Sequence, residues 1–252
     1  MLGQELANHY SRPRFKNGES YALFGNDVKF RTAPSSDAEV IELLEIGTDV
    51  KILAQTTETL LYNGLESPFF KVDHKGKTGY ILGGLISLEK KESENATYLF
   101  AYKKQEEDYS ILVRRVAKNG DYTEISSDLG MPGLTIQLFD NKGLSGIKNI
   151  LYIDNEAQAC GIMGGGIYFF ETKNGFEKVF ETVLYSDAEV SWFKEILIFP
   201  TDENGVADRI VYQKNQGEYG DIATNELKTY ETTRELRWEN GQIVPKISNE
   251  EQ

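Results

Sequence analysis

The chain has 252 residues, and its 27 basic and 40 acidic side chains give a formal net charge of −13, which argues against a general nucleic-acid binder and against attachment to anionic membranes. No apolar run approaches the roughly 20 residues that a transmembrane helix needs. One Cys excludes an internal disulfide, and two His leave too few nitrogen ligands for most zinc or His-dependent catalytic sites.

The N-terminal residues 1–19 are predicted to form an arm ahead of the first domain. The first six residues contain neither the basic nor the apolar segment of a signal peptide. From the residues alone, two alternatives are equally supported: a cytoplasmic protein, and an exported protein whose native signal peptide is absent from this chain.

Residues 20–88 are predicted to form a small β-domain of five or six short strands. Apolar and polar residues alternate in it with the period of half-buried strands. A domain of this size needs a closed or tightly packed sheet to bury its strand edges. The strand-like segments are residues 28–31, 40–46, 50–53, 69–72 and 78–81.

The order and spacing of these segments resemble the bacterial SH3-like (SH3b) family. Two departures from the family pattern are Phe69-Phe70, where a Trp is common, and the stretch 56–68, which is longer than usual. The matching features are a strand ending in Arg31, Ala33-Pro34-Ser35, the apolar 40–44, Gly47 to Val50, Phe70-Lys71-Val72, and the turn and strand at 76–81.

This resemblance implies a small β-barrel that binds a peptide or a peptidoglycan fragment, has no catalytic role and works outside the cytoplasm. It therefore favours the exported alternative. By the same resemblance, Arg31, Phe70 and Tyr80 are the candidate ligand-binding residues. The structural alternative is that Arg31 braces a turn and that the two aromatic side chains belong to the barrel core.

A charged run separates the first predicted domain from the second. Residues 89–95 contain no apolar side chain, as is typical of a solvated linker. Strand-like alternation restarts at Tyr98. We therefore predict a linker at 89–97, a second β-domain at 98–247 and a polar tail at 248–252.

The second domain is predicted to consist of antiparallel hairpins. Asn-Gly occurs six times in the chain, and this pair suits type I′ turns, in which both central residues have positive φ. A capping-box pattern at 186–189 indicates either one short helix or a strand–turn–strand. We expect a mostly-β protein in which a small SH3-like barrel precedes a larger hairpin-rich domain, built as a degenerate propeller-like or sandwich sheet.

One acidic turn of the second domain is a candidate Ca²⁺ loop. Asp202, Asn204 and Asp208 offer oxygen ligands at a spacing that a hard cation can use. The loop weakly resembles those of FG-GAP-type β-propeller repeats. The alternative is a hairpin loop in which Asp, Asn and Gly serve conformational roles. No other cofactor is predicted.

The sequence gives little support to catalysis. A cell-wall cysteine peptidase places its His after the nucleophile, and His9 and His74 both precede Cys160. Carboxylates are numerous, but no pattern pairs two of them for acid/base chemistry.

The leading prediction is a non-catalytic, extracytoplasmic protein of the cell envelope. Its partner is a peptide, a peptidoglycan fragment or an envelope protein, and its acidic surface favours a basic or neutral one. Two alternatives remain: a structural or protein-interaction protein without a small ligand, and a carboxylate-dependent cell-wall hydrolase.

Overall fold

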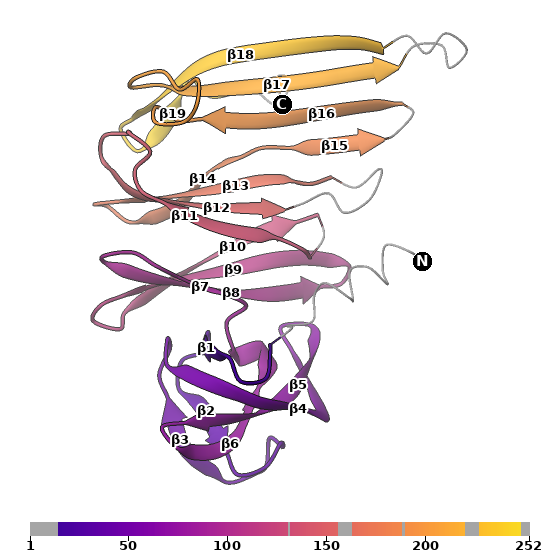
Figure 1. The fold of residues 1–252 in the computed structure, drawn as a ribbon, viewed down its shortest axis with the longest axis vertical. Helices are drawn as coiled ribbons and strands as arrows, with labels where there is room; N and C mark the ends of the chain where they lie inside the picture. The colour runs from indigo at the N-terminus through magenta and orange to yellow at the C-terminus, as the bar shows by residue number, and fades with distance from the viewer. Residues whose placement is uncertain (1–14, 131, 156–162, 188–189, 220–226, 248–252) are drawn as a thin grey trace. The chain divides into compact units, whose positions relative to one another are not determined.

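The computed structural model describes residues 15–130, 132–155, 163–187, 190–219 and 227–247, which form antiparallel β-sheets (Figure 1). The helical structure in these residues is one short 3₁₀ turn, η1 (Gly83–Leu85). No helix in the described ranges is long and apolar enough to cross a membrane. The mostly-β prediction is confirmed. The chain packs into two compact units, residues 1–132 and 133–252.

The first unit begins with a six-stranded sheet in the order β1-β4-β5-β6-β2-β3. The alternation of apolar and polar residues produces alternating burial in β2: Val28 and Phe30 are buried, and Lys29 between them is exposed. Phe30, Phe70 and Ile81 belong to one apolar core. This sheet is the predicted SH3-like barrel. Its strands are β1 (Ser20–Ala22), β2 (Val28–Arg31), β3 (Val40–Leu44), β4 (Asp49–Tyr62), β5 (Leu65–His74) and β6 (Lys77–Leu82).

A second sheet of the first unit has the order β10-β9-β8-β7. Its strands are β7 (Lys90–Glu92), β8 (Ala96–Gln105), β9 (Asp108–Ala117) and β10 (Tyr122–Leu129). Ala22 and Phe24 of the barrel segment pack in one buried cluster with Leu99, Ala101 and Leu112 of this sheet. The barrel and the second sheet therefore share a core.

The charged run predicted as a linker contains a strand. Lys90–Glu92 forms β7, which pairs with β8 from Lys90↔Leu99 to Glu92↔Thr97. The Lys90 ammonium also lies 3.1 Å from the Asp49 carboxylate. Charged side chains, especially Lys, are common on edge strands, where they hinder pairing with another chain. The two compact units divide instead between residues 132 and 133.

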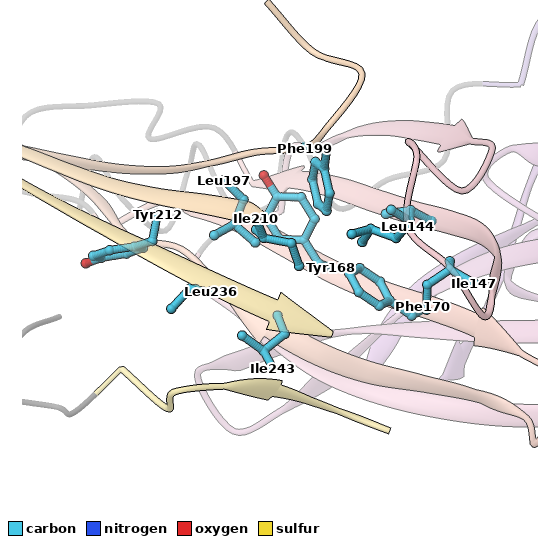
Figure 2. Packing of buried hydrophobic residues seen from close by; sticks show 11 residues of the cluster. Leu144, Ile147, Tyr168, Phe170, Leu197, Phe199, Ile210, Tyr212, Leu236 and Ile243 are labelled. Atoms are coloured by element: carbon cyan, nitrogen blue, oxygen red, sulfur yellow. The ribbon is translucent and has the colours of Figure 1, made fainter. Parts of the chain in front are cut away.

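The second unit consists of two antiparallel sheets, in the orders β11-β12-β13-β14 and β15-β16-β17-β18-β19. The two sheets share one apolar core, in which Tyr168 and Phe170 of β13 lie close to Phe199 and Ile210 (Figure 2). The strands are β11 (Thr135–Phe139), β12 (Ile147–Asn155), β13 (Gly165–Thr172), β14 (Phe176–Glu181), β15 (Leu184–Asp187), β16 (Ser191–Ile198), β17 (Ile210–Tyr219), β18 (Leu227–Glu239) and β19 (Gln242–Val244).

Four of the six Asn-Gly pairs lie in hairpin turns, as predicted, although only two of these four form the expected turn. The pairs at 63–64, 119–120, 174–175 and 240–241 each connect two consecutive antiparallel strands. Both residues have positive φ at 63–64 (51° and 75°) and at 240–241 (52° and 82°), as a type I′ turn requires. At 119–120 and 174–175 only the Gly has positive φ, so those turns are of another type.

The capping-box segment forms a strand rather than a helix in its described part. Ser186 and Asp187 lie in β15, where they pair with Trp192 and Ser191 of β16. The strand–turn–strand alternative therefore fits this segment.

Candidate ligand-binding face of the SH3-like barrel

Strand register brings three long polar side chains together on the outer face of the barrel. Tyr80 of β6 pairs with Lys71 of β5 and with Arg31 of β2. Residues that pair directly across antiparallel strands share a face, with Cβ atoms about 4.5–5.5 Å apart. All three side chains are half-buried, whereas Phe70 and Ile81, which follow the opposite alternation, lie in the core. Lys71, Tyr80 and Arg31 are called the Lys–Tyr–Arg row below.

Apolar residues continue this row at both ends. Ala54 of β4 pairs with Lys71, and Val40 of β3 pairs with Arg31. Val40 and Leu43 of β3 are 39% and 55% exposed. Because β3 is the last strand in the order of its sheet, the row leads to an apolar strand edge.

Arg31 also stabilises a loop, which is the structural role considered for it as an alternative to ligand binding. Its Nη1 donates a hydrogen bond to the Ala38 carbonyl oxygen at 2.6 Å, which holds the loop between β2 and β3. A guanidinium has five N–H donors in a fixed plane, so one such bond leaves donors for a ligand. Bracing and binding are therefore compatible roles for Arg31.

Phe70 does not lie on this face, and its prediction as a ligand contact is corrected. Its side chain is fully buried, and its ring packs edge-on against Phe15 with centroids 5.2 Å apart. Side chains alternate across a strand, so the outward position belongs to the next residue, Lys71. Sequence reasoning missed Lys71. The signal that could have found it is the large aromatic residue at position 70, because burial of that side chain places the next residue on the outer face.

The row is a local concentration of positive charge on an acidic chain. Within the described ranges, neither Lys71 nor Arg31 forms an ion pair with a carboxylate, whereas nearby Lys77 lies 3.0 Å from Glu42. A Tyr between two unpaired cations offers an aromatic face, a hydroxyl and charge-assisted donors at one place. This arrangement suits a ligand that carries a carboxylate.

The unusually long stretch 56–68 has a structural role inside the first unit. The Lys104 backbone N–H donates to the Asn63 carbonyl oxygen at 2.8 Å. A Cβ at Gly64 would lie 1.9 Å from the Lys104 carbonyl oxygen, so only Gly fits there. The tip of the β4–β5 hairpin therefore docks on the end of β8.

In the candidate Ca²⁺ loop, the first carboxylate, that of Asp202, forms an ion pair with Lys142. Asp202 Oδ1 lies 2.6 Å from Lys142 Nζ, and Oδ2 accepts a hydrogen bond from the Phe199 backbone N–H at 2.8 Å. Asn204 and Asp208 have φ values of 62° and 58°, a conformational role typical of Asn and Asp. Among the residues placed by the structure, no group of three or more His, Cys, Asp or Glu side chains could hold a metal. These contacts favour the alternative in which the Asp and Asn side chains of the loop serve conformational roles.

Of the residues considered for cysteine catalysis, the structure describes only His74. Cys160 and His9 lie outside the described residues. His74 is buried, its Nδ1 lies 3.3 Å from the Asp49 carbonyl oxygen, and its ring packs edge-on against Phe30. These contacts give His74 a packing role in the barrel.

Among the described residues of the second unit, Glu171 and Glu195 are the buried carboxylates, and each has hydrogen-bond partners. Glu195 accepts from the Tyr212 hydroxyl at 2.8 Å and from the Val183 backbone N–H at 2.9 Å. Glu171 accepts from the Asn149 side-chain amide at 3.0 Å. Both therefore satisfy polar groups of the fold, and neither supports the hydrolase alternative.

Comparison with known proteins agrees with the structure of the barrel. Residues 26–87 match the family model of the bacterial SH3 domain, a span that includes the whole Lys–Tyr–Arg row. No curated protein and no solved structure matches the chain. The resemblance of the second domain to FG-GAP repeats is not supported by these comparisons. The N-terminal barrel is thus a bacterial SH3 domain, a kind of module that generally binds peptidoglycan or proteins and is common in extracytoplasmic proteins.

Proposed function

We propose that the protein is a non-catalytic binding protein of the bacterial cell envelope, and that it recognises a peptide at the Lys–Tyr–Arg row. The peptide belongs to peptidoglycan or to an envelope protein. The observation that carries the proposal is the cross-strand alignment of Lys71, Tyr80 and Arg31 on the outside of a bacterial SH3 domain. The extracytoplasmic location rests on the usual setting of this family.

The chemistry of the row selects a peptide with a carboxylate. The Lys71 ammonium and the Arg31 guanidinium can both donate charge-assisted hydrogen bonds to a carboxylate, and Tyr80 stands between them. The apolar edge at Val40 and Leu43 continues this surface. An extended peptide can add main-chain hydrogen bonds at such an edge while its side chains contact the face.

The positive charge of the Lys–Tyr–Arg row changes the expected charge of the partner. The net charge of −13 favours a basic or neutral partner at long range. Salt screens charges beyond about 8–10 Å under physiological conditions, however. At contact distance, the two cations of the row therefore decide which ligand binds, and they favour an acidic group.

The proposal is tested by co-sedimentation of the full chain with purified peptidoglycan sacculi. Wild-type protein should pellet saturably, and Tyr80→Ser should raise the half-saturation concentration about tenfold if it removes a contact worth ~1.4 kcal/mol. Tyr230→Ser is the matched control, because Tyr230 is 50% exposed on β18 of the other unit. An equal loss in both variants, or no pelleting of the folded wild type, would count against peptidoglycan recognition by the row.

A further inference from the structure

A cleft of about 760 Å³ with both polar and apolar lining opens around Trp238 in the second unit. It lies where three turns meet: residues 145–148 at the start of β12, 172–174 after β13, and 240–241 after β18. A neighbouring cleft of about 480 Å³ also has Glu177 and Gly241 in its lining. Ligand sites in proteins commonly enclose roughly 300–1,000 Å³, so the space is sufficient for a ligand of several rings.

Trp238 is a fixed aromatic surface in this cleft. The side chain is half-buried, and its ring packs edge-on against the fully buried Phe170 with centroids 5.1 Å apart. No hydrogen bond within the described ranges uses its indole N–H. A ligand that stacks on a side chain already held in place loses less affinity to ordering.

The polar side chains around Trp238 are also available to a ligand. The amides of Asn174 and Asn240 and the charged groups of Lys148, Lys173 and Glu177 form no hydrogen bond or ion pair with other described residues. Some charged groups elsewhere in this unit are paired with one another. Lys178 lies 2.9 Å from Glu181, and Lys142 lies 2.6 Å from Asp202.

We propose that the Trp238 cleft binds an oligosaccharide that carries a carboxylate. The C–H face of a sugar ring packs on an indole, and its hydroxyls need both donors and acceptors, which the Asn174 and Asn240 amides supply. Lys148 and Lys173 oppose the single carboxylate of Glu177, so the cleft has a positive balance that favours an acidic sugar. The site lies in a different unit from the SH3 domain and is independent of peptide binding at the Lys–Tyr–Arg row.

The tryptophan content of the chain allows a direct test. The chain has two Trp, and Trp192→Phe leaves Trp238 as the sole indole fluorophore. The full-length Trp192→Phe protein is titrated with tetrasaccharides of galacturonic acid and of hyaluronan, and with neutral cellotetraose and chitotetraose. The acidic sugars should change the Trp238 emission saturably, with a dissociation constant that rises with salt. A Trp238→Phe protein should show no change.

Variants at exposed positions separate binding from folding. In the Trp192→Phe background, Lys173→Ala should raise the dissociation constant for the acidic sugars at least fivefold. Lys118→Ala, at an exposed lysine in the β9–β10 turn, should leave it unchanged. Tyr80→Ser should also leave it unchanged, which keeps this test separate from that of the SH3 domain.

Three results would overturn the inference. The first is the absence of a saturable response to any of the four sugars by folded protein. The second is equal affinity for acidic and neutral sugars that Lys173→Ala does not alter. The third is a response to a tetraglutamate peptide without one to the acidic sugars, which would assign the cleft to a peptide.

Discussion

Arg114 of β9 donates a hydrogen bond from Nη1 to the backbone carbonyl oxygen of Phe24 at 2.6 Å, and its guanidinium lies 4.2 Å from the centre of the Phe24 ring. Its Nε donates to the Glu124 carboxylate at 2.7 Å, and the side chain is only 16% exposed. One guanidinium thus joins the barrel segment to the neighbouring sheet. This contact adds a polar link beside the apolar core that the two sheets of the first unit share.

Arg114→Ala should therefore destabilise the first unit. It leaves the Phe24 carbonyl and the Glu124 carboxylate without this donor, a loss of about 2–4 kcal/mol in the free energy of opening. Arg114→Lys should recover only part of the lost stability, because a lysine ammonium lacks the planar set of donors of a guanidinium. Native-state hydrogen exchange of β8 and β9 amides measures the effect. The control is Arg237→Ala, whose ion pair with Glu239 is half-exposed; similar protection in both variants would contradict the role of Arg114.

Two glycines of the barrel form a matched pair for testing the docked hairpin. Gly64 and Gly76 have φ values of 75° and 81°, so Ala costs roughly 1 kcal/mol of backbone strain at either position. A Cβ at Gly76 meets nothing within 4 Å, whereas one at Gly64 collides with Lys104. Gly64→Ala should therefore reduce protection of the first unit by about 1–3 kcal/mol more than Gly76→Ala. Equal effects would show that the hairpin tip does not need this close approach.

Much of the barrel could be predicted from the sequence because its signals are local. The alternation at Val28 and Phe30 and the Asn63-Gly64 turn each specify a conformation within a few residues. The Arg114 contact could not be predicted, because Phe24 lies 90 residues away and adjacent arginines in a strand look like a solvated face. The strand at 90–92 was missed for a related reason: an edge strand needs no apolar residue.

The Lys–Tyr–Arg row was only partly visible in the sequence. The family resemblance pointed to Arg31 and Tyr80, but the neighbours of Tyr80 depend on the register of β5, β6 and β2. Register is a long-range property, and a shift of one residue would move Lys71 to the other face. The Trp238 cleft shows the same limit, since its turns lie far apart in sequence.

Calcium should not stabilise the second unit through the loop at 202–208. The Lys142 ammonium occupies Asp202 Oδ1, and the Phe199 N–H occupies Oδ2. A Ca²⁺ ion would have to displace a cation that is already bound. The melting temperature should be the same in about 2 mM CaCl₂ as in excess chelator. This Ca²⁺ concentration is on the order of the dissociation constants of weak extracellular Ca²⁺ sites. A rise with Ca²⁺ that Asp208→Asn abolishes would instead establish the metal site.

The stability of the second unit should fall at high pH. Burial, assisted by the Asp154 carboxylate, raises the pKa of Tyr152 to about 12, and burial also raises the pKa of Tyr168. Unfolded tyrosines ionise near pH 10, so above that pH the unfolded chain loses protons that the folded chain keeps. The contribution of the neutral Tyr152 hydroxyl is complete below pH 10 and is lost as the pH rises through its folded pKa of about 12.

Tyr152→Phe tests this pH dependence. Above pH 10 its melting temperature should fall less steeply than that of the wild type, because one group with a raised pKa is gone. Trp192 and Trp238 both lie in the second unit and report its unfolding by fluorescence. Tyr230→Phe, at a half-exposed position, should keep the wild-type slope. Identical slopes in all three proteins would contradict the assignment to Tyr152.

The central claim is that the Lys–Tyr–Arg row of the SH3 domain binds the peptide of peptidoglycan, and charge reversal at Lys71 tests it most directly. The full-length Lys71→Glu protein is compared in sacculus co-sedimentation with Lys118→Glu, which makes the same change at an exposed lysine of the β9–β10 turn. The account predicts that Lys71→Glu abolishes saturable pelleting and that Lys118→Glu pellets like the wild type. Wild-type pelleting by a folded Lys71→Glu protein would contradict it.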